Sequence, residues 1–268
     1  MKEYFNIEKF LDKYPNLEKN IQDDNIDIYK LEQIYMDYIK YKSSYETQAD
    51  FIANILRYNS EVHSVKSRIK DNYGLIEKII RKTKDRREKY GQDFEFTVDN
   101  YKNEINDLIG IRVIHIFKDQ WEDIHKFIKK TWKVIEITAN VRDGDNTKRF
   151  EELDIEVRSR QSGYRSVHYL VEFYPTNQRV IAEIQVRTIF EEGYGEIDHR
   201  LRYSHDEIPE ILKSNLLLFN RIIGSADEMA SLINNLNKEW LDNEKMYKKI
   251  IEEKDKEINE LKAKLRWV

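Results

Sequence analysis

The chain has 268 residues, a formal net charge of −4 and no cysteine. The lack of cysteine excludes disulfide bridges, thiolate zinc sites and cysteine nucleophiles, and the negative net charge argues against a general nucleic-acid binder. No apolar run approaches the roughly eighteen residues of a membrane span, and the first residues lack the apolar segment of a signal peptide. We therefore expect a cytoplasmic protein that does not interact with a membrane.

Long helices are expected throughout, because 8 glycines and 3 prolines leave few breaks between elements. Residues 1–60 have apolar positions at helical spacing and no strand alternation, which predicts a helical region. In the next segment, 64–90, ten lysines and arginines stand against four acids, and residues 74–89 carry the apolar stripe of an amphipathic helix. A basic segment in an acidic protein suggests a confined anionic ligand.

The middle of the chain predicts a sheet. A buried strand over residues 107–117 precedes a helix at 121–130. We expect further strands at 134–140, 153–158, 166–174 and 179–187, a loop at 143–150 and a hairpin connection at 175–178. This order predicts an α+β fold around a small mixed sheet flanked by helices.

From Phe190 onward the pattern is helical. The stretch 238–265 is highly charged, and apolar residues follow each other at three- and four-residue spacing with an interruption at Lys254: Ile251, Ile258, Leu261 and Leu265. Two interpretations remain open, a solvated terminal helix packed on its own domain and an oligomerisation helix. We divide the chain into a helical N-terminal region (1–60), a central domain (61–205) and a C-terminal helical extension (206–268).

The sharpest chemical signal is the segment 182–188. As a strand it places Glu183, Gln185 and Arg187 on one face and Ile184 and Val186 on the other. An acid, an amide and a guanidinium in a row do not form a core, so this face is expected to look into a polar cleft.

Asp107 begins another apolar strand, which carries the isolated Arg112. If the two strands are neighbours, Asp107 and Glu183 form a carboxylate pair, the usual way to hold Mg²⁺ against a triphosphate, and Glu183 can also accept a hydroxyl proton. Taken singly, each carboxylate is better explained as a strand-edge acid paired with Arg112 or Arg187. Together with the polar face, the pair indicates phosphoryl or pyrophosphoryl transfer.

Four cations of the basic segment are candidates for holding a nucleotide triphosphate: Arg68, Lys70, Lys78 and Arg81. A solvated helix face is the alternative, and by themselves these residues would favour it. The sequence GxxxxGK[ST] is absent, so this is not a P-loop protein.

The segment 163–168 joins a loop to a strand. Tyr164 offers an aromatic face to a base, and Arg165 and His168 can meet phosphate; each has an ordinary structural alternative. Two acidic or His-Asp groupings are discounted as metal sites. Glu191 and Glu196 fit a solvated acidic helix, and the doublet at 205–206 has no further ligands at suitable spacing.

The ordered motifs resemble the synthetase domain of RelA/SpoT-type enzymes, and specifically a small, single-domain alarmone synthetase. The resemblance covers about 64–203 and rests on four blocks: the basic segment with Arg68, Lys70, Lys78 and Arg81; Asp107 to Arg112; Gly163 to His168; and Glu183 to Thr188 with the helix after it. It implies a nucleotidyltransferase-like sheet. It also implies Mg²⁺-dependent transfer of the β,γ-pyrophosphate of ATP to the ribose 3′-hydroxyl of GDP or GTP.

Residue by residue, the resemblance implies an ATP site at the four cations of the basic segment, with Asp107 and Glu183 as Mg²⁺ ligands. Glu183, Asp107 and Arg112 would be catalytic. The acceptor site would comprise Arg160, Tyr164, Arg165, His168, Gln185 and Glu192. The short region before the basic segment leads us to expect synthesis without a hydrolase domain.

The sequence departs from related small synthetases at two points that bear on substrate. Glu192 stands where asparagine is frequent beside the acceptor base, and Gly74 stands where serine is frequent in the ATP segment. Three functions therefore stay open: a GTP pyrophosphokinase, the same transfer to an adenine nucleotide or a tRNA 3′ end, and a catalytically weak nucleotide sensor. Self-association through the C-terminal helices is a further expectation.

Overall fold

The computed structural model describes residues 4–175, 178–203 and 208–265. In this part of the chain, six strands form one mixed sheet in the order β1-β2-β6-β5-β3-β4. The strands are β1 (Ser64–Ile69), β2 (Ile109–His115), β3 (Lys133–Val141), β4 (Glu156–Ser159), β5 (Ser166–Phe173) and β6 (Val180–Thr188). β2–β6 and β3–β4 pair in parallel, and the other neighbours pair antiparallel. The expected α+β fold around a small mixed sheet is confirmed.

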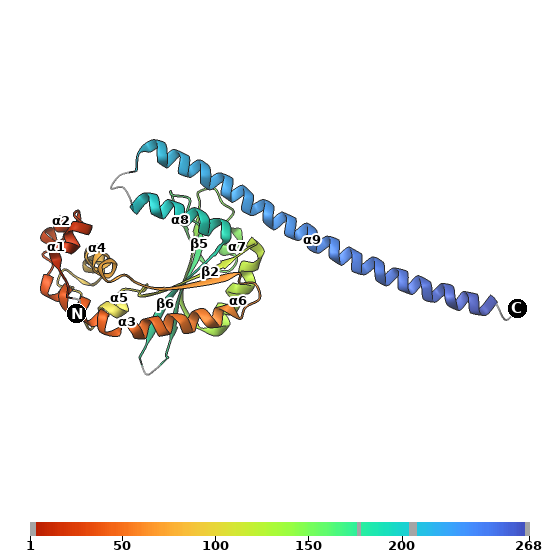
Figure 1. Cartoon of the computed structure of the whole chain (residues 1–268), viewed down its shortest axis with the longest axis horizontal. Coiled ribbons are helices and arrows are strands. Elements are labelled where there is room, and N and C mark those ends of the chain that lie inside the picture. The colour runs from red at the N-terminus through yellow and green to blue at the C-terminus, as the bar shows by residue number, and fades with distance from the viewer. Residues whose placement is uncertain (1–3, 176–177, 204–207, 266–268) are drawn as a thin grey trace.

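Helices surround this sheet (Figure 1). Before β1 lie α1 (Ile7–Lys13), α2 (Leu17–Asp23) and α3 (Ile28–Arg57), as the helical spacing predicts. The helices between the strands are α4 (Asn72–Tyr90), α5 (Tyr101–Glu104), the 3₁₀ turn η1 (Lys118–Gln120), α6 (Trp121–Thr131) and α7 (Lys148–Glu151). After β6 come α8 (Ile189–Tyr203) and α9 (Glu210–Leu265).

The basic segment is divided between two elements, a division that its composition did not reveal. Residues 64–69 form β1, whose side chains alternate between the faces of the sheet, and the predicted amphipathic helix is α4. The prediction of a loop over residues 143–150 is wrong at its C-terminal end, because α7 begins at Lys148. The hairpin tip at 176–177 and the doublet at 205–206 lie outside the described residues.

The hydrophobic core lies between α3 and one face of the sheet. Ile34, Ile52 and Leu56 of α3 are fully buried and belong to the same cluster as Ile109 and Ile111 of β2. Asp27 begins this helix by accepting a hydrogen bond from the backbone N–H of Tyr29 at 2.9 Å. α3 therefore covers the apolar face of the sheet, and the opposite face carries polar side chains.

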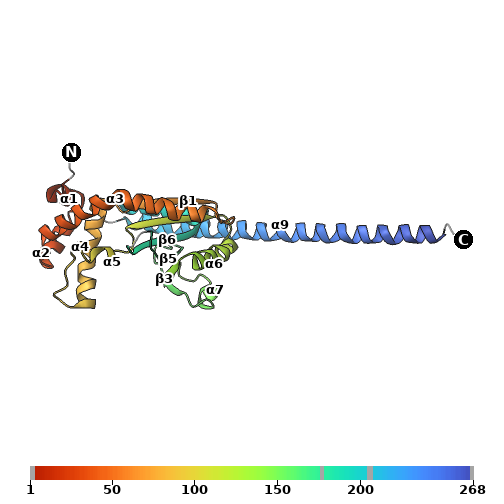
Figure 2. The same cartoon turned by 90° about the horizontal axis from the view of Figure 1, so that it is seen from below.

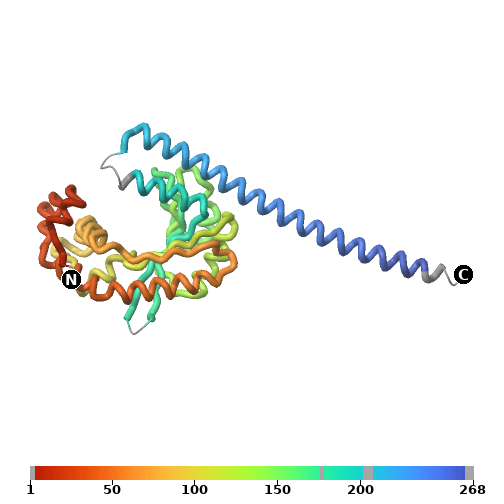
Figure 3. Tube along the Cα trace, in the orientation of Figure 1, coloured from red at the N-terminus to blue at the C-terminus, as the bar shows by residue number. Residues whose placement is uncertain are grey.

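The two C-terminal helices differ in length and in surroundings. α8 lies across the polar face of the sheet, and the first half of α9 packs against α8. The second half of the 56-residue α9 extends away from the rest of the molecule (Figures 1, 2 and 3). None of the described helices has an apolar stretch long enough to cross a bilayer.

α9 is attached to the domain partly through a buried carboxyl group. The side chain of Asp227 is 1% exposed, and its Oδ2 lies 3.8 Å from Lys118 Nζ. Burial, with Glu191 nearby, raises the pKa of Asp227 to about 7, although Lys118, Thr188 and Arg165 lower it. The folded state therefore favours the protonated acid, and ionisation of Asp227 opposes folding.

This buried acid gives a pH-dependent prediction. The stabilising effect of protonated Asp227 is complete below pH 4 and is lost as the pH rises to about 7. Asp227→Asn should therefore increase the free energy of unfolding at pH 8 by on the order of 2–4 kcal/mol, and change it little at pH 4. Urea unfolding at both pH values measures the difference.

Glu228→Gln is the control, because the Glu228 side chain is 67% exposed and should show no such pH-dependent gain. If the stability of the wild type and of Asp227→Asn changed equally with pH, the raised pKa would not belong to Asp227.

Candidate active site

One face of the sheet carries the polar side chains that the sequence groups together. In the β2–β6 pair, Gly110 lies opposite Glu183 and Arg112 opposite Gln185. In the β5–β6 pair, His168 lies opposite Gln185. Residues directly opposite each other share a face of a sheet. Arg112, Glu183, Gln185 and His168 therefore face the same side, from three adjacent strands.

The sequence predicts that Asp107 and Glu183 pair only if their two strands are neighbours. The structure meets this condition, since β2 and β6 are adjacent in the sheet. Asp107 precedes β2 by two residues and accepts ion pairs from Lys70 and Lys78, both at 2.8 Å. Burial would raise the pKa of Asp107, but Lys78 and Lys70 outweigh it and hold the pKa below its ordinary value. Asp107 is therefore ionised at neutral pH and balanced by two cations.

Glu183 is positioned by its neighbours on the same face. Gln185 Nε2 donates to its Oε2 at 2.6 Å, and His168 Nδ1 lies 3.3 Å from its Oε1. Burial would raise the pKa of Glu183, and the charge of Asp107 adds to this effect, but the contacts with His168 and Gln185 prevail and the pKa is lowered.

A cavity of about 260 Å³ opens beside Asp107. Its lining residues are Lys13, Tyr14, Arg68, Lys70, Asp71, Gly74, Asp107 and His199. Two of the predicted triphosphate-binding residues, Arg68 and Lys70, line it, and Lys78 reaches its edge through Asp107. Arg81 does not line it; its Nε donates to Glu77 at 3.0 Å and its side chain is 60% exposed.

Positive charge accumulates along α4 next to this cavity. Burial together with the nearby Lys78 and Arg86 lowers the pKa of Lys82, despite the opposing effect of Asp107. A group of neighbouring cations attracts a polyanionic ligand, which relieves the repulsion between them.

Sequence reasoning missed four residues of the cavity wall: Lys13, Tyr14, Asp71 and His199. Lys13 ends α1 and Tyr14 is its C-cap, whereas His199 comes from α8. Lys13 also pairs with Asp71, the N-cap of α4, at 3.4 Å. No local motif marks these residues, because only the packing of α1 and α8 around α4 and β1 brings them together.

Tyr164 and His168 lie on the other side of Glu183. Tyr164 Oη lies 3.0 Å from His168 Nε2, and the Arg187 guanidinium carbon lies 5.6 Å from the centre of the Tyr164 ring. The predicted acceptor residues Tyr164, His168 and Gln185 therefore form one contiguous chain of contacts with Glu183.

A cluster of ion pairs fixes α8 to this face. Glu192, 6% exposed, contacts Arg187 Nε at 2.8 Å and Arg112 Nη1 and Lys66 Nζ at 3.4 Å each. Arg112 also pairs with Glu196. Arg112 and Glu192, expected in separate catalytic and acceptor roles, are partners of each other, and Glu196 is part of the same cluster rather than of a solvated helix face.

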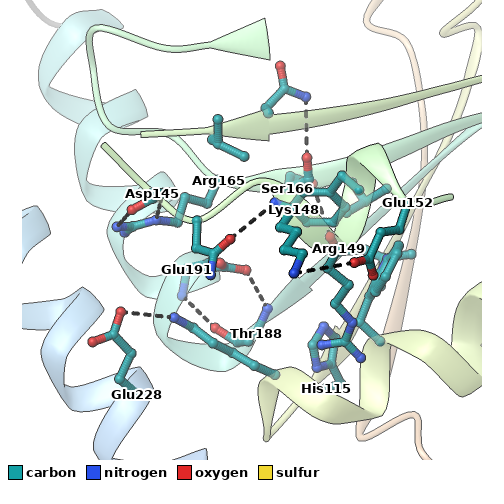
Figure 4. Close-up of a pocket in the computed structure, with 18 residues that line it drawn as sticks. His115, Asp145, Lys148, Arg149, Glu152, Arg165, Ser166, Thr188, Glu191 and Glu228 are labelled. Carbon is teal, nitrogen blue, oxygen red and sulfur yellow. Dashed lines mark hydrogen bonds and ion pairs between the residues drawn. The ribbon is translucent and has the colours of Figure 1, made fainter. Parts of the chain in front are cut away.

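Two predicted acceptor residues have partners outside this chain of contacts. Arg165 forms a two-pronged ion pair with Asp145, at 2.6 and 2.8 Å, and lines a separate cavity of about 570 Å³ with α7, Thr188 and Glu228 (Figure 4). Arg160 Nε donates to Asn140 Oδ1 at 2.6 Å. The structure thus separates Arg165 from Tyr164, because neighbouring residues in an extended segment point to opposite sides.

The loop that carries Tyr164 is anchored by α9. Asn220 Nδ2 donates to the carbonyl oxygen of Gly163 at 2.8 Å, and Arg165 Nη1 lies 3.4 Å from Asn220 Oδ1. Gly163 has φ +76°, and a Cβ there would lie 2.7 Å from the Asn220 side chain. Glycine is required at this position both by the backbone conformation and by the close approach of α9.

Comparisons with known proteins identify a family over the central part of the chain. The model of the family described as "Region found in RelA / SpoT proteins" matches residues 67–208. The Bacillus subtilis GTP pyrophosphokinase YwaC is 24% identical over 169 residues, which is 61% of this chain and 69% of that protein. The Bacillus subtilis GTP pyrophosphokinase YjbM is 28% identical over 137 residues, 48% of this chain and 57% of that protein.

Solved structures show the same fold. The small alarmone synthetase 1 from Bacillus subtilis superposes with a TM-score of 0.57 at 21% identity, covering 75% of this chain and 96% of the other. The same protein bound to its product pppGpp gives a TM-score of 0.54 at 21% identity, covering 74% and 94%.

The anchoring of the Tyr164 loop can be tested with two glycine variants. Gly144 also has a positive φ, +82°, but a Cβ there would meet nothing within 4 Å. Gly144→Ala should therefore cost only the backbone strain, about 1–2 kcal/mol of unfolding free energy. Gly163→Ala should cost about 1–3 kcal/mol more, because Asn220 must also move. Urea unfolding measures both, and equal losses would contradict the contact with α9.

Proposed function

The chain belongs to the RelA/SpoT family, and from this we propose that it is a GTP pyrophosphokinase that makes (p)ppGpp-type alarmones. It transfers the β,γ-pyrophosphate of ATP to the ribose 3′-hydroxyl of GDP or GTP, with Mg²⁺ as cofactor. One observation carries the proposal: Asp107 lines a cation-lined cavity, Glu183 belongs to the contact group of Tyr164, His168 and Gln185, and the two acids come from the neighbouring strand segments of β2 and β6. The reaction consumes ATP and guanine nucleotides, so we place it in the cytoplasm.

The cation-lined cavity is the proposed ATP site. Arg68 and Lys70 line it, and Lys78 stands behind Asp107. In the nucleotide-free site, Lys70 and Lys78 are balanced by Asp107. A bound triphosphate offers these lysines stronger acceptors. Arg81, on the exposed face of the same helix, would reach the phosphates only by leaving Glu77.

The donor set fits Mg²⁺. This ion is typically held by one or two carboxylates together with substrate phosphates and water, and Asp107, just before β2, and Glu183, on the neighbouring β6, would supply two carboxylates. The described residues contain no cluster of three or more His, Cys, Asp or Glu side chains that would form a complete protein cage. When bound, the ion neutralises charge on the phosphate oxygens.

Glu183 is the proposed general base. The 3′-hydroxyl oxygen attacks the β-phosphorus of ATP, the bond from that phosphorus to the α-phosphate oxygen breaks, and AMP leaves. The hydroxyl proton passes to Glu183, whose lowered pKa keeps it ionised before the step. His168 and Gln185 hold the carboxylate in place, and Arg112 supplies positive charge between the two substrates.

The acceptor nucleotide is proposed to stack on Tyr164, with His168 and Gln185 beside the ribose. Tyr164 is already held between His168 and Arg187, so a base can add to this stack with little rearrangement. Glu192 is engaged by three cations. It would therefore act on the acceptor through the positions of Arg112 and Arg187 rather than by direct contact, and Arg165 is left out of the acceptor site.

The first test is a transfer assay with γ-labelled ATP and Mg²⁺, offering GDP, GTP, ATP and deacylated tRNA separately. We expect the label on GDP or GTP. Glu183→Gln should reduce the transfer rate by about 10²–10⁴-fold, the usual contribution of a general base, while nucleotide binding persists. Glu156→Gln, on the exposed edge strand β4, is the control and should keep full activity.

The other outcomes of the transfer assay distinguish a different acceptor from a nucleotide sensor. Label only on an adenine nucleotide or tRNA would keep the chemistry and overturn the acceptor. Binding of ATP and GTP without transfer to any acceptor would overturn the enzyme assignment in favour of a nucleotide sensor.

The position of Arg68 provides a second test of the ATP site. A Cβ at Gly110 would lie 3.2 Å from Arg68 Nε, so Gly110→Ala should shift the Arg68 side chain by a few tenths of an ångström and disturb its position on the cavity wall. ATP affinity, measured by isothermal titration calorimetry, should fall by about 3–10-fold, as expected for the loss of roughly 1 kcal/mol of interaction. Gly193→Ala, where a Cβ meets nothing within 4 Å, should leave ATP affinity unchanged. Unchanged affinity in Gly110→Ala would remove Arg68 from the proposed site.

A further inference from the structure

A second cavity, apart from the proposed ATP site, lies at the end of the sheet where β2, β3 and β6 finish and β5 begins (Figure 4). Its volume is about 570 Å³, and pockets that hold small molecules measure roughly 300–1,000 Å³. Val167 and Val186, opposite each other in the β5–β6 pair, are part of its lining. Glu183 and Gln185 point to the other side of β6, because successive residues of a strand alternate between faces. A ligand in this cavity would therefore lie apart from the candidate active site.

Charge in this cavity is already balanced. The three least exposed cations of its described lining are paired with carboxylates: Arg165 with Asp145, Lys118 with Glu228 and Arg149 with Glu122. The positive N-terminal end of α8 is occupied as well, because Glu191 accepts a hydrogen bond from the backbone N–H of Thr188 at 2.8 Å. A phosphate group would have to break such pairs, whereas an uncharged ligand leaves them intact.

His115 brings a hydrogen-bond acceptor to the cavity. It is 2% exposed, and its Nδ1 lies 2.9 Å from the carbonyl oxygen of Phe117. A carbonyl only accepts, so Nδ1 carries the hydrogen and Nε2 keeps its lone pair, for which the described residues offer no donor. Burial lowers the pKa of His115 although Glu191 and the Phe117 carbonyl oppose this effect, so the ring is neutral at neutral pH. Its Nε2 can therefore accept a hydrogen bond from an N–H group of a ligand.

The rest of the lining suits a flat ring. Trp121 and Phe150 meet edge to face with their ring centres 5.1 Å apart, and Val141 adds aliphatic surface. The exposed Asn146 accepts a hydrogen bond from the backbone N–H of Lys148 at 3.1 Å through its Oδ1, so its amide N–H groups can donate. A mostly apolar wall with one buried acceptor and an amide donor matches a heterocycle that carries both an N–H donor and ring acceptors.

We propose that this cavity binds an uncharged nucleobase or nucleoside. An N–H group of the base donates to His115 Nε2, the ring packs against the Trp121–Phe150 pair and the valines, and an acceptor atom of the base meets the amide of Asn146. None of the proposed catalytic residues lines this cavity, so binding here does not depend on pyrophosphate transfer.

Binding is measured on the full chain by NMR at the indole N–H resonance of Trp121, which lines the cavity and is assigned with Trp121→Phe. At least one of adenosine, guanosine and cytidine should shift this resonance. His115→Asn keeps a donor for Phe117 but removes Nε2, and it should lower the affinity for that nucleoside by about 5–10-fold. His63→Asn is the control, because it makes the same exchange at an exposed position outside the lining. A resonance that none of the three nucleosides shifts, or equal affinities in the wild type and His115→Asn, would overturn the proposal.

Matched ligands test the same contacts in the wild type, without relying on the folding of a variant. Methylation of the N–H donors of the bound base, as in N6,N6-dimethyladenosine for adenosine, should lower the affinity by a similar factor, because His115 Nε2 then has no donor. The 5′-monophosphate of the same nucleoside should bind more weakly, since the cations of the cavity already have partners. Tighter binding of the monophosphate at the Trp121 resonance, or unchanged affinity of the methylated nucleoside, would overturn the assignment to an uncharged base.

Discussion

The parallel pairing of β2 with β6 is the constraint on which the site depends. It sets Gly110 opposite Glu183 and Arg112 opposite Gln185, and a slip of one residue would turn every side chain of one strand to the other face. The apolar alternation fixes this register, because Ile111, Val113, Ile184 and Val186 must all reach the core under α3. The polar face of the candidate site is therefore a consequence of how the core is packed.

The polar face stores much of its charge in ion pairs. Asp107 is balanced by Lys70 and Lys78, and Glu192 by Arg187, Arg112 and Lys66. Buried charges without partners would be costly, so these pairs stabilise the face before a nucleotide arrives. A triphosphate can then replace Asp107 as the partner of the two lysines, whereas the Glu192 cluster keeps α8 in place.

α9 links the site to the rest of the molecule. Its inner face holds the Tyr164 loop through Asn220 and buries Asp227, and its opposite side carries exposed apolar residues such as Trp240 and Ile251. The position of the Tyr164 loop therefore depends on how α9 packs against the domain.

The sequence by itself determined the α+β class, most of the helices and strands, and the polar face of β6, because apolar periodicity and strand alternation are local properties. It also made Asp107 and Glu183 candidates for the site, since isolated acids beside apolar strands are conspicuous. The tertiary structure decided which residues share a cavity. Lys13, Tyr14 and His199 meet Arg68 only through packing, and Arg165, adjacent to Tyr164 in sequence, turns toward Asp145. Contacts between distant segments depend on how the elements pack, and no local pattern records that.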